Sequence, residues 1–92
     1  MTKTTPEGKL KAQVKEYLTA IGAYHYWPVP AGYGAPQVDC IGCHKGRYFA
    51  IETKVRPRRA TPNQLKVLQD VQNAGGIALV AYDLETVKQY VA

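Results

Sequence analysis

The sequence has little of several features that would indicate other classes of protein. Its 92 residues leave no room for a second hydrophobic core, so we expect a single domain over residues 1–92. No apolar run approaches the roughly 18 residues of a membrane span, and no membrane association is expected. The N-terminus is polar and lacks the apolar segment of a signal peptide, which predicts a cytoplasmic protein that is not secreted.

Cysteine is scarce, with only two residues, Cys40 and Cys43, and both are expected to be reduced in the cytoplasm. With His44 they match the C-x-x-C-H string of haem attachment, but the export route that this chemistry needs is lacking and the only methionine is Met1. A zinc site that adds His25 is the stronger alternative. Residues three apart on a strand leave opposite faces, however, so we expect buried thiols and no haem.

Acidic side chains are also few. Seven Asp and Glu residues stand against twelve Lys and Arg residues, for a net charge of +5 and a pI near 9.3. This balance favours an anionic partner such as nucleic acid, with a merely soluble basic protein as the alternative. The apolar fraction of 46% is ample for a globular fold.

Capping residues and apolar periodicity predict the order α-β-β-β-α-β-α. The first helix opens at Thr5-Pro6-Glu7 and ends at Gly22, and a strand covers 24–27. A second helix opens at Thr61-Pro62-Asn63-Gln64 with a capping box, buries Leu65, Leu68 and Val71, and ends at Gly75-Gly76. The apolar run 77–82 is typical of a central strand covered on both faces, and Asp83 caps a last helix. The two strands around the second helix should be parallel.

The segment 40–50 reads as an antiparallel hairpin that turns at Lys45-Gly46. With a two-residue loop, paired residue numbers sum to 91, which places Asp39 opposite Glu52. Two carboxylates across a strand pair repel each other, and a divalent cation between them would remove the penalty. Alternation puts Lys54 on the face of Glu52 and turns Thr53 to the other face. Two acids and an ammonium are the groups needed for metal-assisted attack on a phosphodiester.

Inside this order of elements, Asp39, the glycine-turned hairpin and Glu52-Thr53-Lys54 resemble the PD-(D/E)XK nuclease superfamily. The similarity is closest to compact, phage-like members of the virus-type replication-repair nuclease (VRR-NUC) family. It extends over nearly the whole chain, through Thr5-Pro6-Glu7-Gly8, Gly32-Tyr33-Gly34, residues 39–42, residues 45–54, Thr61-Pro62-Asn63-Gln64 and Ala74-Gly75-Gly76. The superfamily name implies a proline directly before the aspartate, but here Gln37-Val38 separate Pro36 from Asp39. Because of this departure, the resemblance does not predict the backbone conformation around Asp39.

The resemblance implies an α/β fold with a restriction-endonuclease-like core, a small mixed sheet flanked by helices. It implies that the Thr53 carbonyl joins Asp39 and Glu52 in binding Mg²⁺ or Mn²⁺, ions that prefer carboxylate oxygens. Lys54 would orient or help deprotonate the attacking water. Glu7 on the first helix would complete the site, or it only favours the helix N-terminus. Gln64 would lie at the rim of the site, although the capping box explains it equally well.

Basic residues that follow the Glu52-Thr53-Lys54 strand suit contacts with phosphates, or they form a solvated loop: Arg56, Arg58, Arg59 and Lys66. Tyr33 approaches the scissile phosphate or covers the core. These features predict a metal-dependent DNA endonuclease, and the resemblance points to branched, flapped or four-way-junction DNA, as in DNA repair. Cutting two strands needs two copies of so small a domain, so a homodimer is expected. A DNA-binding module without activity is the alternative, and a small zinc protein is a more distant one.

Overall fold

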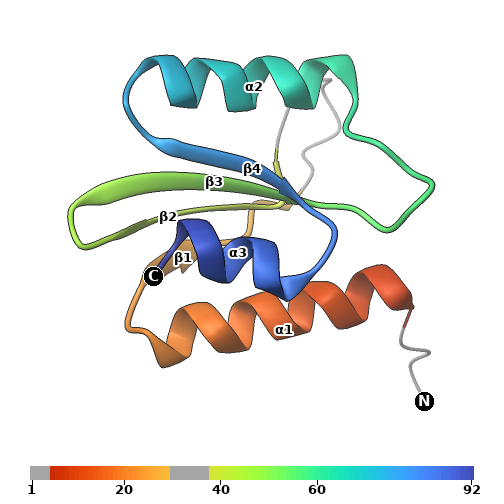
Figure 1. The fold of residues 1–92 in the computed structure, drawn as a ribbon, viewed down its shortest axis with the longest axis horizontal. Helices are drawn as coiled ribbons and strands as arrows, with labels where there is room; N and C mark the ends of the chain where they lie inside the picture. Colours follow the sequence, from red (N-terminus) through yellow and green to blue (C-terminus); the bar gives the residue numbers. More distant parts are fainter. Residues whose placement is uncertain (1–4, 30–37) are drawn as a thin grey trace.

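The computed structural model describes residues 5–29 and 38–92. Its elements follow the predicted order: α1 (Pro6–Ala20), β1 (Tyr24–Tyr26), β2 (Cys40–His44), β3 (Arg47–Thr53), α2 (Pro62–Asn73), β4 (Ile77–Ala81) and α3 (Leu84–Tyr90). No helix in these two ranges is long and apolar enough to cross a membrane. The fold is α/β, with helices on both faces of a small sheet (Figure 1).

The described residues form one four-stranded mixed sheet in the order β1-β2-β3-β4. Strands β1, β2 and β3 are antiparallel neighbours, and β4 runs parallel to β3 as the predicted βαβ unit requires. The prediction that 77–82 is a central strand is wrong in position, because β4 lies at the edge of this sheet. Its apolar run has another reason, since α2 and α3 both pack on β4.

The hairpin of β2 and β3 has the predicted register. His44 pairs with Arg47 and Cys40 with Ile51, so the residue numbers sum to 91 along the ladder. The loop is Lys45-Gly46, with φ of 52° and 81°. Positive φ at both positions is typical of the type I′ turn, whose twist matches that of the strands. A two-residue turn of this kind fixes the register, and therefore which residues lie opposite each other at the end of the hairpin away from the turn.

Two apolar clusters hold the helices to the two faces of the sheet. Helices α1 and α3 cover one face, where Leu18, Phe49, Ile51 and Val87 are fully buried. Helix α2 covers the other face through a smaller cluster around Ala50 and Leu68. Residues 50 and 51 therefore mark the two faces of β3, and alternation assigns Glu52 to the α2 face.

Helix α2 begins with the predicted capping box at Thr61 and Gln64. The predicted burial of Leu65 is wrong, because 51% of its surface is exposed. The inward stripe instead runs through Val67, Leu68 and Val71. These positions are spaced three, four and seven residues after Gln64, so the stripe continues back to that glutamine. The rotation of the helix thus turns Gln64, and not Leu65, toward the sheet.

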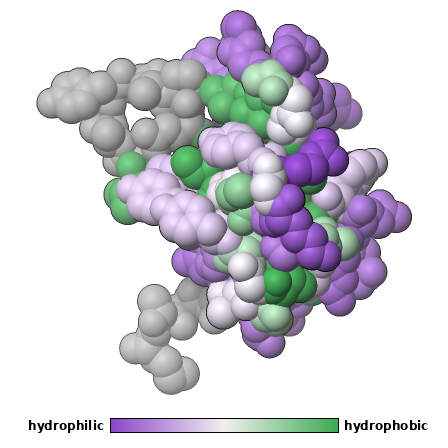
Figure 2. Space-filling view, turned by 90° about the vertical axis from the view of Figure 1, so that its left-hand side faces the viewer, coloured by the Kyte–Doolittle hydropathy of each residue, from purple (hydrophilic) through white to green (hydrophobic). Residues whose placement is uncertain are grey.

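The carboxyl ends of two strands and the beginnings of two helices lie at one end of the molecule. On the right of Figure 1, β3 and β4 reach their carboxyl ends, α1 and α2 begin, and the segment 55–61 connects β3 to α2. The opposite end, seen in Figure 2, carries hydrophobic and hydrophilic side chains intermixed. In α/β folds, ligands bind outside the carboxyl ends of parallel strands. The predicted site at the end of β3 therefore lies where such a fold binds its ligands.

Candidate active site

Glu52 is the buried centre of the site, near the end of β3. Its side chain is only 2% exposed, yet both carboxylate oxygens have partners. Oε1 accepts a hydrogen bond of 3.0 Å from the Asp39 backbone amide. Oε2 accepts one of 3.0 Å from Gln64 Nε2 and lies 3.2 Å from Lys54 Nζ. Three of the residues predicted to be catalytic therefore converge on Glu52.

Burial raises the pKa of the Glu52 carboxyl, and the charge of nearby Asp39 raises it further. Lys54 acts in the opposite direction through both its hydrogen bond and its charge, as does the Asp39 amide. Desolvation and a like charge both disfavour the ionised form, whereas donors and cations restore it. A cation next to Glu52 would therefore favour the carboxylate.

Asp39 lies just outside the ladder, because β2 begins at Cys40. Its Oδ2 accepts hydrogen bonds from Thr53, of 2.9 Å from the backbone amide and 2.6 Å from Oγ1. Its Oδ1 lies 3.4 Å from Lys11 Nζ on α1. The prediction that the Asp39 side chain shares the face of Glu52, with Thr53 turned to the other face, is therefore wrong for Asp39, since alternation does not extend past the last ladder pair. Asp39 reaches toward α1, while the Glu52 side chain reaches toward α2.

Gln64 makes the contacts that both of its predicted roles require, in the capping box and beside Glu52. Its backbone amide donates to Thr61 Oγ1, and its Oε1 accepts from the Thr61 amide, which completes the capping box. Its Nε2 is left free for Glu52. One side-chain amide has both an acceptor and a donor end, so the two roles do not compete. The cap thus fixes the position of a group in the site.

Glu7 lies half-buried in the first turn of α1. It lines a pocket of about 320 Å³ together with Arg56 and Arg58 of the segment after β3. The structure thus brings Glu7 to the same end of the sheet as Asp39. The residues that the structure describes contain no group of three Asp, Glu, His or Cys side chains that could hold a metal ion. Glu7 thus does not form a three-acid cluster with Asp39 and Glu52 in the described residues, and its catalytic role stays a prediction.

The other predicted DNA-binding residues differ in their surroundings. The Arg56 guanidinium stacks over the Tyr82 ring at 4.3 Å, and Arg59 is exposed. Lys66 Nζ pairs with Asp70 Oδ1 at 2.8 Å on the outer side of α2. Tyr33 falls outside the described residues, as do the glycines on either side of it. Arg56 and Arg58 line the same pocket as Glu7.

The donor set fits a hard divalent cation. Asp39 and Glu52 supply carboxylate oxygens from adjacent positions, and the Asp39 side chain is 19% exposed. Mg²⁺ is commonly held by one or two protein carboxylates, with water and substrate phosphates completing its octahedral shell. Two acids thus suffice for such an ion without a third acidic ligand. In the apo protein, Lys11 and Lys54 each offset one of the two charges.

Two features of the site were not among the predictions from the sequence. Lys11 stands four residues after Glu7, and this spacing places both side chains on one side of α1. That spacing could have pointed to Lys11. The Thr53 side chain was assigned no role because its hydroxyl was expected to face away from Asp39. A threonine at the last ladder position carried no signal for its bond to Asp39.

The two cysteines have opposite environments, as their spacing predicted. Cys40 is fully buried in the α1 layer, and burial raises the pKa of its thiol to about 12. Cys43 is exposed, so the expectation that it is buried is wrong. His25 accepts at Nδ1 from Trp27 Nε1 (2.9 Å) and contacts Thr19 Oγ1 through Nε2 (3.0 Å). Both imidazole nitrogens therefore have partners, which argues against the zinc alternative.

A thiol-reactive reagent at pH 8 is expected to label one cysteine per folded chain. The thiolate is the reactive form, and a buried thiol with a pKa of about 12 supplies almost none. Counting labelled thiols by mass spectrometry should give one adduct, absent from Cys43→Ser and present in Cys40→Ser. Unfolding in denaturant should release the second thiol. Protection of both thiols, reversed by a chelator, would contradict this assignment and support zinc.

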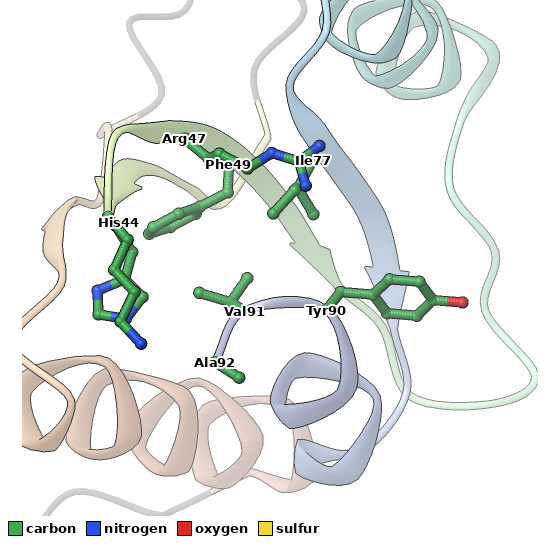
Figure 3. Close-up of a pocket in the computed structure, with 8 residues that line it drawn as sticks. His44, Arg47, Phe49, Ile77, Tyr90, Val91 and Ala92 are labelled. Carbon is green, nitrogen blue, oxygen red and sulfur yellow. The ribbon is translucent and has the colours of Figure 1, made fainter.

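A second pocket, of about 240 Å³, lies at the opposite end of the sheet, between the hairpin turn and the end of α3 (Figure 3). Its lining includes His44, Arg47 and Phe49 from the hairpin and Val91 from the C-terminal segment. None of the predicted catalytic residues lines it. The pocket is thus separate from the carboxylate pair.

The fold of this chain resembles that of a known protein. A solved structure of a VRR_NUC domain superposes with a TM-score of 0.72, covers 92% of both chains and is 24% identical in sequence. The chain has the VRR_NUC fold. This likeness confirms the fold that the sequence resemblance implied, over nearly the whole length of both chains. No protein-family model and no curated protein matches the sequence. The likeness to the VRR_NUC domain is thus seen in the structure and not in a match to a family model or a curated protein.

Proposed function

We propose that this protein is a metal-dependent DNA endonuclease that hydrolyses phosphodiester bonds. One observation carries the proposal: Asp39, Lys54 and Gln64 all contact the buried carboxylate of Glu52, at the carboxyl end of β3. A buried acid beside a second acid costs stability, and such arrangements are typical of sites for binding or chemistry. The VRR_NUC fold of the chain supports a nuclease rather than another phosphate-binding function.

Asp39 and Glu52, with the Thr53 carbonyl, are the groups that we expect to hold Mg²⁺ or Mn²⁺. When bound, such an ion lowers the pKa of a water ligand and neutralises charge on the phosphate. Lys54 Nζ, which contacts Glu52 Oε2, would orient the attacking water and stabilise the negative charge that develops on the phosphate. Gln64, fixed by its cap, holds the Glu52 carboxylate in one orientation. Glu7 would orient water or a ligand from the α1 side.

Cleavage of a labelled DNA panel tests this proposal directly. Linear, flapped and four-way-junction DNAs would be incubated with Mg²⁺, Mn²⁺ or EDTA. We expect cutting that requires the divalent ion and favours the branched DNAs. Binding without cutting under all conditions would favour the alternative of an inactive DNA-binding module. Equal cutting of every DNA would support the nuclease activity and contradict the preference for branched DNA.

Cutting both strands of a branched DNA requires two active sites, so we propose that the active form is a homodimer in the cytoplasm. Light scattering with and without four-way DNA measures the mass of the protein and of its DNA complex, and so the number of chains in each. A monomeric complex that still makes paired cuts would contradict the dimer.

The segment after β3 is expected to bind DNA without taking part in the chemistry. Arg58 and Arg59 are exposed, and no ion pair to either is formed by the described residues. Arg58→Ala with Arg59→Ala should weaken DNA binding for all sequences. The slope of log affinity against log salt should flatten by about 0.9 for each duplex contact that is lost. Fluorescence anisotropy at several salt concentrations measures this slope.

Lys88→Ala serves as the matched control, because Lys88 lies on α3 and pairs with Glu85. Its salt slope should equal that of the wild type. An unchanged slope in the double arginine variant would mean that DNA enters across another surface.

A further inference from the structure

Lys11 holds the one carboxylate oxygen of Asp39 that a metal ion would need. Asp39 Oδ2 already accepts two hydrogen bonds from Thr53. Oδ1 has one cationic partner among the described residues, the Lys11 ammonium at 3.4 Å. A cation that binds Asp39 without breaking the contacts to Thr53 must therefore approach Oδ1. That position is the one that Lys11 Nζ approaches in the apo protein.

The second lysine of the site is held differently. Lys54 is 11% exposed and contacts the Glu52 oxygen that also accepts from Gln64. Lys11 is 35% exposed, and its ammonium is held by a single contact on the surface of α1. A partly exposed ion pair of this length contributes little to stability, so its separation costs little. Lys11 can thus move away while Lys54 stays in place.

We propose that Lys11 is a resident counter-cation of Asp39, which leaves Oδ1 when a divalent cation binds. Without a bound divalent cation, its ammonium offsets the charge of Asp39. On binding, two cations cannot share the same oxygen without repulsion, so the long side chain turns outward. Lys11 thereby sets the divalent-ion concentration at which the site fills. The inference rests on the proposed function, because it assumes that Asp39 is a metal ligand.

Isothermal titration of the DNA-free protein with Mn²⁺ tests this role without any activity measurement. Lys11→Met keeps the aliphatic stem and removes the charge. Loss of one unit charge within a few ångströms of the bound ion should tighten the Mn²⁺ Kd by about five-fold. Lys9→Met is the matched control, since Lys9 is exposed on the same helix and no ion pair to it is formed by the described residues. Its Kd should stay within about two-fold of the wild type, because a more distant surface charge is screened.

Thermal unfolding gives a second readout. In EDTA, Lys11→Met should unfold near the wild-type temperature, whereas low Mn²⁺ should stabilise the variant more than the wild type. Lys11→Gln should behave in the same way if the charge is the cause.

Equal Kd values for Lys11→Met and the wild type, or weaker binding by Lys11→Met, would overturn the inference. If the wild type binds Mn²⁺ and cuts DNA but Lys11→Met has the same Kd as the wild type, only the proposed role of Lys11 is contradicted. If neither protein binds Mn²⁺, the metal-dependent function falls as well.

Discussion

Replacing Asp39 with Ala is expected to abolish DNA cleavage and to destabilise the fold at the same time. The variant loses a carboxylate of the metal site, which should lower kcat by at least about 1,000-fold, because stabilisation of developing charge contributes more to catalysis than most other effects. It also leaves the amide and hydroxyl of fully buried Thr53 without their acceptor. Two orphaned donors should lower the free energy of unfolding by about 2–4 kcal/mol. Denaturant unfolding in EDTA measures this loss.

Asp39→Asn separates the two effects. Its side-chain oxygen can still accept both hydrogen bonds from Thr53, while the negative charge is gone. We expect a free energy of unfolding within about 1 kcal/mol of the wild type, because only a partly exposed ion pair with Lys11 is lost. Cleavage and the stabilisation by Mn²⁺ should be lost as in Asp39→Ala. Wild-type cutting rates in Asp39→Asn would remove Asp39 from the site.

Replacing Lys54 with Met is expected to lower kcat at saturating DNA by about 100-fold or more, because the ammonium acts on the transition state. The KM should change much less, since the arginines after β3 remain. The double variant of Arg58 and Arg59 should show the reverse pattern, with weaker binding and a smaller loss of kcat. Steady-state kinetics over a range of DNA concentrations measure the two constants separately. Equal kcat values for Lys54→Met and the wild type would contradict the role of Lys54.

Lys54→Met should also show a characteristic dependence of stability on pH. Without the ammonium, the pKa of Glu52 rises further in the folded state. A group with a raised folded pKa contributes stability below its unfolded pKa, and that stability is lost as the pH rises through the folded value. The stability deficit of the variant relative to wild type should therefore be small in acid and grow toward neutral pH. A deficit independent of pH would indicate that lost packing is the cause.

Much of the fold could be predicted because its signals are local. Thr5 and Thr61 cap the two long helices through contacts three residues away. Lys45-Gly46 sets the hairpin register through the backbone angles of only two residues. Once that register is known, the backbone of Asp39 must lie beside Glu52, and this proximity follows from counting. These predictions need no knowledge of how distant segments pack.

Predictions failed where the outcome depends on contacts between distant segments. The direction of the Asp39 side chain depends on Thr53 and on Lys11 of α1, beyond the end of the ladder. The exposure of Leu65 depends on the rotation of α2 over the sheet, which a pattern of apolar residues determines only to within a position or so. The apolar run of β4 is explained by the helices that cover both of its faces. Such a run does not indicate whether the strand is central or at the edge of the sheet.

The sequence by itself determined the order of elements, the hairpin register and the set of residue types at the carboxyl end of β3. Caps, turns and alternation act over a few bonds, so a single chain is enough to predict them. Only the tertiary structure decided that Gln64 caps its helix and contacts Glu52 at once, and that Lys11 neutralises Asp39. Those contacts join α1, β3 and α2, and side chains that are far apart in sequence find their partners only when the helices pack on the sheet.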